Sequence, residues 1–79
     1  MPRGLLNWSY KDVTEFLKDH GFEFKENKKG SHEAWIHNET QAIVDINFNG
    51  SKEFPPRTLE TMIRQSKLDK KEWRMWASK

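Results

Sequence analysis

The chain begins with a pattern that predicts a helix from about Tyr10 to His20. Ser9 can cap this helix, because its hydroxyl can accept a hydrogen bond from the otherwise unpaired main-chain amide of Asp12. Gly21 follows, and glycine readily takes the left-handed conformation that ends many helices. The apolar residues that predict one buried helix face, through spacings of three and four, are Tyr10, Val13, Phe16 and Leu17.

From Phe22 onward the apolar positions alternate with polar ones, which is the pattern of half-buried β-strands. The first predicted strand starts at Phe22, the second spans His32–His37 and the third spans Gln41–Phe48. Two polar stretches, Asn27–Ser31 and Asn38–Thr40, are predicted as turns. The buried faces are expected to carry Phe22 and Phe24 in the first strand, and Ala42, Val44, Ile46 and Phe48 in the third. The sheet is therefore expected to be a three-stranded antiparallel meander.

Two more helices are predicted after the sheet. Pro55-Pro56 enters a helix whose apolar stripe is Leu59, Met62 and Ile63 and which ends near Lys67-Leu68. Asp69 then opens a last short helix that places Trp73 and Trp76 on one face. These two indoles are expected either to dock on the domain or to contact a partner protein.

The order of elements predicts an α+β fold, with two helices on one face of the antiparallel sheet and a short C-terminal helix. We interpret residues 1–79 as a single domain, with a core at about residues 10–68 and a helical extension at about 69–77. A chain of 79 residues can bury one small core only, so a cleft between two domains is excluded. The same layering occurs in small RNA-binding domains, although a fold alone does not assign a function.

Composition narrows the possible chemistry. The chain has no cysteine, which excludes disulfides, thiolate metal sites and a cysteine nucleophile. Its three histidines are dispersed without the paired spacing of a zinc site. No apolar stretch reaches signal-peptide or membrane-spanning length, so we expect a soluble protein of a reducing cytoplasm. The net charge of +2 permits a polyanionic partner without requiring one.

A series of motifs resembles the HicA toxin family from roughly Tyr10 to Leu68. The series is His20-Gly21-Phe22, a basic turn into Gly30-Ser31-His32, an aliphatic third strand, and Asn49-Gly50-Ser51-Lys52-Glu53-Phe54-Pro55-Pro56 before a helix. The resemblance implies a double-stranded-RNA-binding-domain-like fold of α-β-β-β-α order. It also implies an mRNA interferase that cleaves mRNA and blocks translation, with His32 as its catalytic histidine. The implied partner is a HicB antitoxin that masks the active site in a bacterial cytoplasm, and no metal or organic cofactor is implied.

Four positions differ from the family pattern. Family members often carry proline and then histidine at the end of the third strand, where this chain has Asn47 and Asn49. The glycine that often follows the proline pair is Arg57. The glycine that often ends the second helix is Lys67, which must either adopt a strained backbone or end the helix differently.

Metal-free RNA cleavage needs a base for the 2′-hydroxyl, an acid for the leaving 5′-oxygen and positive charge around the phosphate. Histidine suits the acid–base role, because its ordinary pKa of about 6.5 lies close to cellular pH. The turn containing Lys28, Lys29, Gly30 and Ser31 can hold a phosphate, and Gly30 lets the RNA backbone approach closely. Lys52 and Arg57 are the second candidates for RNA binding.

Other roles remain open for several of these residues. From position alone His32 is a polar residue that opens a strand, and strand alternation does not settle which face of the sheet carries it. His37 is expected on the surface and His20 in a structural role at the helix end. Trp35 either stacks a base on the open sheet face or belongs to the core. Trp73 and Trp76 are expected to contact an antitoxin or a second copy rather than RNA.

Two rival functions remain. A non-catalytic RNA-binding module of the same fold would bind RNA through shape and phosphate contacts and would yield no cleavage products. A protein-interaction module would form a tight complex with another protein and would have no affinity for RNA.

Overall fold

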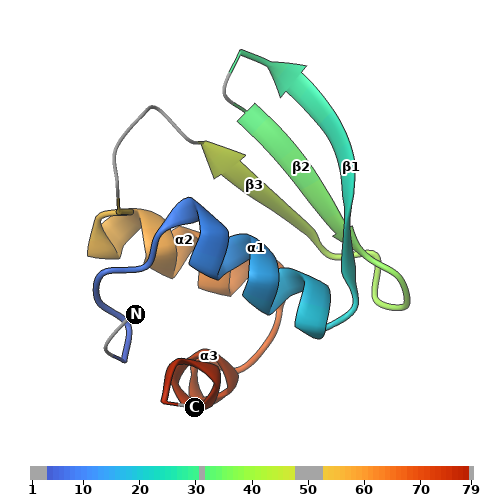
Figure 1. Cartoon of the computed structure of the whole chain (residues 1–79). Coiled ribbons are helices and arrows are strands. Elements are labelled where there is room, and N and C mark those ends of the chain that lie inside the picture. Colours follow the sequence, from blue (N-terminus) through green and yellow to red (C-terminus); the bar gives the residue numbers. More distant parts are fainter. Residues whose placement is uncertain (1–3, 31, 48–52, 79) are drawn as a thin grey trace.

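The computed structural model describes residues 4–30, 32–47 and 53–78 of the chain. The elements in chain order are α1 (Tyr10–Asp19), β1 (Phe22–Lys29), β2 (His32–His37), β3 (Ile43–Asn47), α2 (Pro56–Ser66) and α3 (Lys70–Ala77). The strands form one antiparallel sheet in the order β1-β2-β3. Figure 1 shows α1 and α2 on one face of this sheet, with α3 packed beyond them. The predicted α+β fold, with its α-β-β-β-α order and an added C-terminal helix, is confirmed.

The start of α1 follows the prediction closely. Ser9 is the N-cap, and its hydroxyl oxygen accepts from the Asp12 main-chain amide at 3.1 Å. The Asp12 carboxylate in turn accepts from the Ser9 amide at 3.0 Å, which completes a capping box. The helix ends at Asp19, and Gly21 has a φ of +88°, so the left-handed stop predicted from glycine is present.

Strand β1 is longer than the sequence pattern predicts. The turn expected at Asn27–Ser31 begins only after Lys29, because Asn27 pairs with Glu33 and Lys29 pairs with His32 across the ladder. Two register shifts, between Phe24 and Glu26 and between Asn27 and Lys29, let the polar stretch remain paired. The side chain of Phe24, expected on a half-buried face, is 51% exposed on this edge strand, where it packs edge-on against Trp35.

The hydrophobic core lies between the sheet and the helices. Trp35 belongs to it, which excludes a base-stacking role on the open face of the sheet. Ala42, Val44 and Ile46 are buried as predicted, and Phe48 lies outside the described residues. The core residues are Trp8, Val13, Phe16, Leu17, Phe22, Trp35, Ala42, Val44, Ile46, Phe54, Leu59, Met62, Ile63, Trp73 and Ala77.

The C-terminal helix docks on the domain rather than extending from it. The Trp73 side chain is fully buried, stacks on Phe16 with ring centroids 4.0 Å apart, and donates from Nε1 to Ser66 Oγ at 3.4 Å. The Trp76 indole is partly buried and donates to the Asp19 carboxylate at 2.8 Å. Of the two alternatives left open for Trp73, docking on the domain is confirmed, and contact with a partner protein is excluded because the core already covers the side chain. No helix within residues 4–30, 32–47 and 53–78 is long and apolar enough to cross a membrane.

Helix α2 ends on a residue with a strained backbone. Lys67 is its C-cap and has φ +62° and ψ +13°, a left-handed conformation that costs an L-residue with a side chain roughly 1–2 kcal/mol. Lys67→Gly is therefore expected to stabilise the protein by about 1 kcal/mol, as measured by urea unfolding. Lys71→Gly, inside α3, is the matched control and should destabilise instead. A loss of stability in Lys67→Gly would contradict this account.

Tyr10 joins α1 to β2 through a partly buried hydrogen bond. Its hydroxyl donates to Glu33 Oε1 at 2.7 Å, and the Trp35 indole donates to the same oxygen at 3.1 Å. The pKa of Tyr10 is raised from the ordinary value of 10.0 to about 12, and burial is the largest cause. The hydrogen bond to Glu33 and the negative charge of Glu33 raise it further.

This tyrosine gives a prediction that a simple titration can check, because it is the chain's only tyrosine. The ultraviolet absorbance of tyrosinate should appear with a pKa of about 12 in the folded protein. Since the folded value lies above the unfolded value of 10.0, the contribution to stability is complete below pH 10 and is lost as the pH rises through 12. Glu33→Gln should lower the pKa only partly, because burial is the larger cause. Titration of the folded protein near 10 would contradict this account.

Candidate functional site

His32 is the first residue of β2, and the strand register fixes which face of the sheet carries it. It pairs with Lys29 of β1 on one side and with Asn47 of β3 on the other. Two residues further along β2, Ala34 pairs with Asp45. Side chains alternate between the two faces, so His32 lies opposite the face that carries the core residue Trp35. The histidine therefore lies on the sheet face away from α1, and its side chain is exposed.

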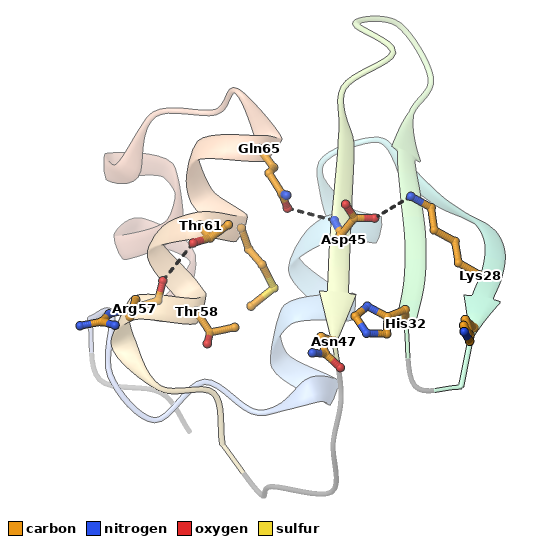
Figure 2. A pocket seen from close by; sticks show the side chains of 10 residues that line it. Lys28, His32, Asp45, Asn47, Arg57, Thr58, Thr61 and Gln65 are labelled. Atoms are coloured by element: carbon orange, nitrogen blue, oxygen red, sulfur yellow. Dashed lines mark hydrogen bonds and ion pairs between the residues drawn. The ribbon is translucent and has the colours of Figure 1, made fainter.

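The open face and α2 together line a shallow, solvent-open hollow of about 540 Å³. Four elements supply its lining: β1 and β2 at the hairpin, β3 in the middle and one side of α2 (Figure 2). The lining residues are Lys28, Lys29, His32, Asp45, Asn47, Arg57, Thr58, Thr61, Met62 and Gln65. A volume of this size falls in the range of ligand-binding pockets, which is roughly 300–1,000 Å³.

An ion pair crosses the sheet inside this hollow. Lys28 Nζ on β1 lies 3.2 Å from Asp45 Oδ1 on β3, so the lysine side chain passes over β2. Ala34 pairs with Asp45 and is small enough for a lysine stem to pass. Both charged side chains are about half exposed, which makes the pair weak and easily exchanged for another partner. The hollow can therefore offer a cation to an incoming anion.

The hairpin that carries the lysines is held in shape by two features. Gly30 has a φ of +59°, and a Cβ added there would meet nothing within 4 Å, so the glycine serves the backbone turn and leaves open space beside it. The Asn27 side chain, with its amide nitrogen facing the turn, donates to the main-chain oxygens of Gly30 and His32 at 3.0 and 3.2 Å. These bonds fix the backbone on which His32 is carried.

The wall formed by α2 has a different chemistry, because it presents neutral polar groups above an apolar floor. Gln65 Oε1 accepts from the Asp45 main-chain amide at 3.0 Å, and Thr61 Oγ1 donates to the Arg57 main-chain oxygen at 3.2 Å. Met62 is only 1% exposed and also lines the hollow. The hollow thus has a cationic side at the hairpin, whereas the α2 side carries neutral hydrogen-bonding groups apart from Arg57 at the start of the helix.

The structure brings together five of the residues that the sequence predicted for the site. Lys28, Lys29 and His32 line the hollow, and Gly30 lies in the turn beside it. Arg57 also lines the hollow, but Figure 2 shows its guanidinium turned away from His32. Ser31 and Lys52 lie outside the described residues, as does Asn49. Within the described part of the chain, no group of three His, Cys, Asp or Glu side chains could hold a metal ion.

Comparison with known proteins identifies the family. The chain matches the family described as HicA toxin of bacterial toxin–antitoxin over residues 10–68, which is most of its length. The chain belongs to the HicA toxin family. No curated protein matches it. Membership makes the chain the toxin of a bacterial toxin–antitoxin system, and such a system includes an antitoxin partner.

The three histidines of this HicA chain have different surroundings. His20 Nδ1 lies 2.8 Å from the Phe16 main-chain oxygen, and its ring stacks on Phe16. His37 Nδ1 accepts from the main-chain amides of Glu39 and Thr40 at 3.0 and 3.1 Å, which stabilises the turn after β2. His32 is the one histidine among the described residues that lines the hollow with the lysines. The structural role expected for His20 agrees with its contacts, whereas His37, expected on the surface, is only partly exposed.

Apart from Arg57, sequence reasoning missed the site residues that β3 and α2 contribute to the hollow. Asp45 alternates with the buried Val44 and Ile46, so the strand pattern already placed it on the open face. Four α2 residues share one side of the helix at spacings of three, four and seven, namely Thr58, Thr61, Met62 and Gln65. That spacing was visible in the sequence, but which element this side of the helix meets depends on the tertiary fold.

Proposed function

We propose that this chain is the toxin of a HicA/HicB-type system and acts as a metal-independent endoribonuclease, an mRNA interferase that cleaves mRNA and blocks translation. His32 is its general acid/base. The observation that carries the proposal is the position of His32 on the open sheet face, in one hollow with Lys28 and Lys29. Membership of the HicA family supports it.

The reaction needs only groups that RNA and the chain supply. The His32 imidazole accepts the proton of a 2′-hydroxyl, and the freed 2′-oxygen attacks the adjacent phosphorus. The bond from phosphorus to the 5′-oxygen breaks, and that oxygen takes a proton from water or a lysine. Lys28 and Lys29 stabilise the negative charge that builds on the phosphate oxygens. The products carry a 2′,3′-cyclic phosphate and a 5′-hydroxyl.

The partner in this proposal is a HicB-like antitoxin that covers the hollow and blocks access of mRNA to His32, in a bacterial cytoplasm. Because one hollow would serve both partners, antitoxin and RNA should compete. Adding RNA to the toxin–antitoxin complex should therefore not yield cleavage until the antitoxin dissociates.

The direct test incubates the purified protein with single-stranded RNA in EDTA and follows product length over time by gel electrophoresis. The proposal requires cleavage that the chelator does not prevent. A non-catalytic RNA-binding module would instead show binding that weakens with salt and intact RNA throughout. Tight binding to an antitoxin without any affinity for RNA would favour a protein-interaction module.

Asp45→Asn should strengthen RNA binding, because it releases the Lys28 ammonium from its ion pair. The slope of log affinity against log salt concentration should steepen by about 0.7, the value for one added phosphate contact on a single strand. Fluorescence anisotropy with labelled RNA measures this slope. Glu39→Gln, in the turn after β2, removes the same charge and is the control. Equal effects of the two variants would show that only net charge matters.

A further inference from the structure

The α2 side of the hollow has the chemistry of a site for a nucleobase rather than for a phosphate. Of the side chains that α2 contributes to the hollow, only Arg57 is charged, and its guanidinium is turned away from His32 (Figure 2). The cations Lys28 and Lys29 come from β1 at the other side. The buried side chain of Met62 forms the floor of this part of the hollow. Its polarizable sulfur can make favourable contacts with an aromatic ring. A phosphate on the lysines would therefore leave its neighbouring base beside α2.

Gln65 presents hydrogen-bond donors with a fixed orientation. A main-chain amide can only donate, so the Gln65 oxygen must face the Asp45 N–H, to which it is joined at 3.0 Å (Figure 2). The side-chain amino group is then left with two N–H donors, and within the described residues no hydrogen bond uses them. The usual two-bond pairing of glutamine with adenine needs the oxygen as well, and here Asp45 occupies that oxygen.

The neighbouring threonine offers the complementary acceptor. Thr61 donates its hydroxyl proton to the Arg57 main-chain oxygen at 3.2 Å, so the oxygen keeps lone pairs for an incoming N–H. A base that combines a carbonyl oxygen with an adjacent ring N–H matches this pair. Uracil has both groups in O4 and N3–H, whereas cytosine has an amino group and a bare ring nitrogen at the same positions.

We propose that the α2 side of the hollow is a nucleobase site in which Gln65 donates to a base carbonyl oxygen, so that the protein prefers uracil to cytosine. The inference rests on the proposed action on RNA and adds the part of the substrate that would set sequence preference. Gln65 is the specificity-determining residue, and Thr61 assists it.

The test measures binding, so that it does not depend on cleavage. The His32→Ala protein is titrated with labelled oligouridine and oligocytidine of equal length at fixed salt, followed by fluorescence anisotropy. Oligouridine should bind roughly fivefold more tightly, the value of one net hydrogen bond. Gln65→Met in the same background should bring the ratio of the oligouridine and oligocytidine affinities near one. Gln65→Glu should reverse the preference, because a carboxylate accepts from the cytosine amino group while still accepting from the Asp45 amide.

The matched control is Gln41→Met, which removes the chain's other glutamine side-chain amide from the turn before β3 and should leave the ratio unchanged. Equal binding of the two oligonucleotides, no RNA binding at all, or a preference that survives Gln65→Met would overturn the inference. Cleavage by the wild-type protein is scored separately. Cleavage with a base ratio independent of Gln65 would leave the ribonuclease proposal standing and remove only the base site. An affinity ratio that depends on Gln65, without any cleavage, would support the base site and remove the ribonuclease proposal.

Discussion

His32→Ala is expected to slow RNA cleavage by roughly 10²- to 10⁴-fold, the usual contribution of one general acid or base. Among the described residues, His32 is the one histidine that lines the hollow. Removing its imidazole therefore leaves water to accept the 2′-hydroxyl proton. Rates are compared as initial slopes of product formation with protein in excess over labelled RNA, which separates the chemical step from product release.

Binding and stability distinguish a chemical role of His32 from a structural one. The side chain is exposed at the strand start, so His32→Ala should unfold at nearly the wild-type urea concentration and bind RNA within a few-fold of wild type. His37→Ala, at the other end of β2, is the histidine control and should cleave at close to the wild-type rate. Equal cleavage by His32→Ala and the wild type would remove His32 from the mechanism.

Trp73→Ala should destabilise the fold by about 3–5 kcal/mol, the range for truncating a buried tryptophan. The indole is fully buried, stacks on Phe16, lies 5.3 Å from the Trp8 ring and donates to the buried Ser66 hydroxyl. Removing it opens a cavity and also takes away a donor to Ser66. Because small domains have only about 5–15 kcal/mol of stability, a loss of this size should leave the variant close to unfolding at room temperature.

Urea unfolding followed by far-ultraviolet circular dichroism measures this loss. Met75→Ala is the control on the same helix, because its side chain is 56% exposed, and it should change stability by less than about 0.5 kcal/mol. A similarly small effect of Trp73→Ala would mean that α3 does not hold the core. The expected result would show that a helix beyond the family match at residues 10–68 still supplies part of the core.

The sequence predicted the elements well where local chemistry decides them. Ser9 and Gly21 set the ends of α1, and the spacing of Leu59, Met62 and Ile63 gave the buried stripe of α2. It was wrong at β1, because Asn27–Lys29 remain paired to β2 through irregularities in register that turn propensity does not reveal. It also left the docking of Trp73 open, since only the packed structure shows that Trp8 and Phe16 receive the indole.

For the site, the sequence supplied the hairpin side and, of the helix side, only Arg57. His32, Lys28 and Lys29 were found because the family motif and the local charge single them out. The face of His32 stayed open until the pairing of His32 with Asn47 was known. Asp45 and Gln65 were not predicted, because their roles arise from the contact between β3 and α2, which are far apart in sequence.

The most direct test of the account is the chemistry of the RNA ends that the wild-type protein produces in EDTA. Mass determination of the fragments should find 2′,3′-cyclic phosphate at one end and 5′-hydroxyl at the other, because the attacking oxygen comes from the RNA itself. Fragments ending in 5′-phosphate and 3′-hydroxyl, or RNA that remains intact, would contradict internal attack assisted by His32.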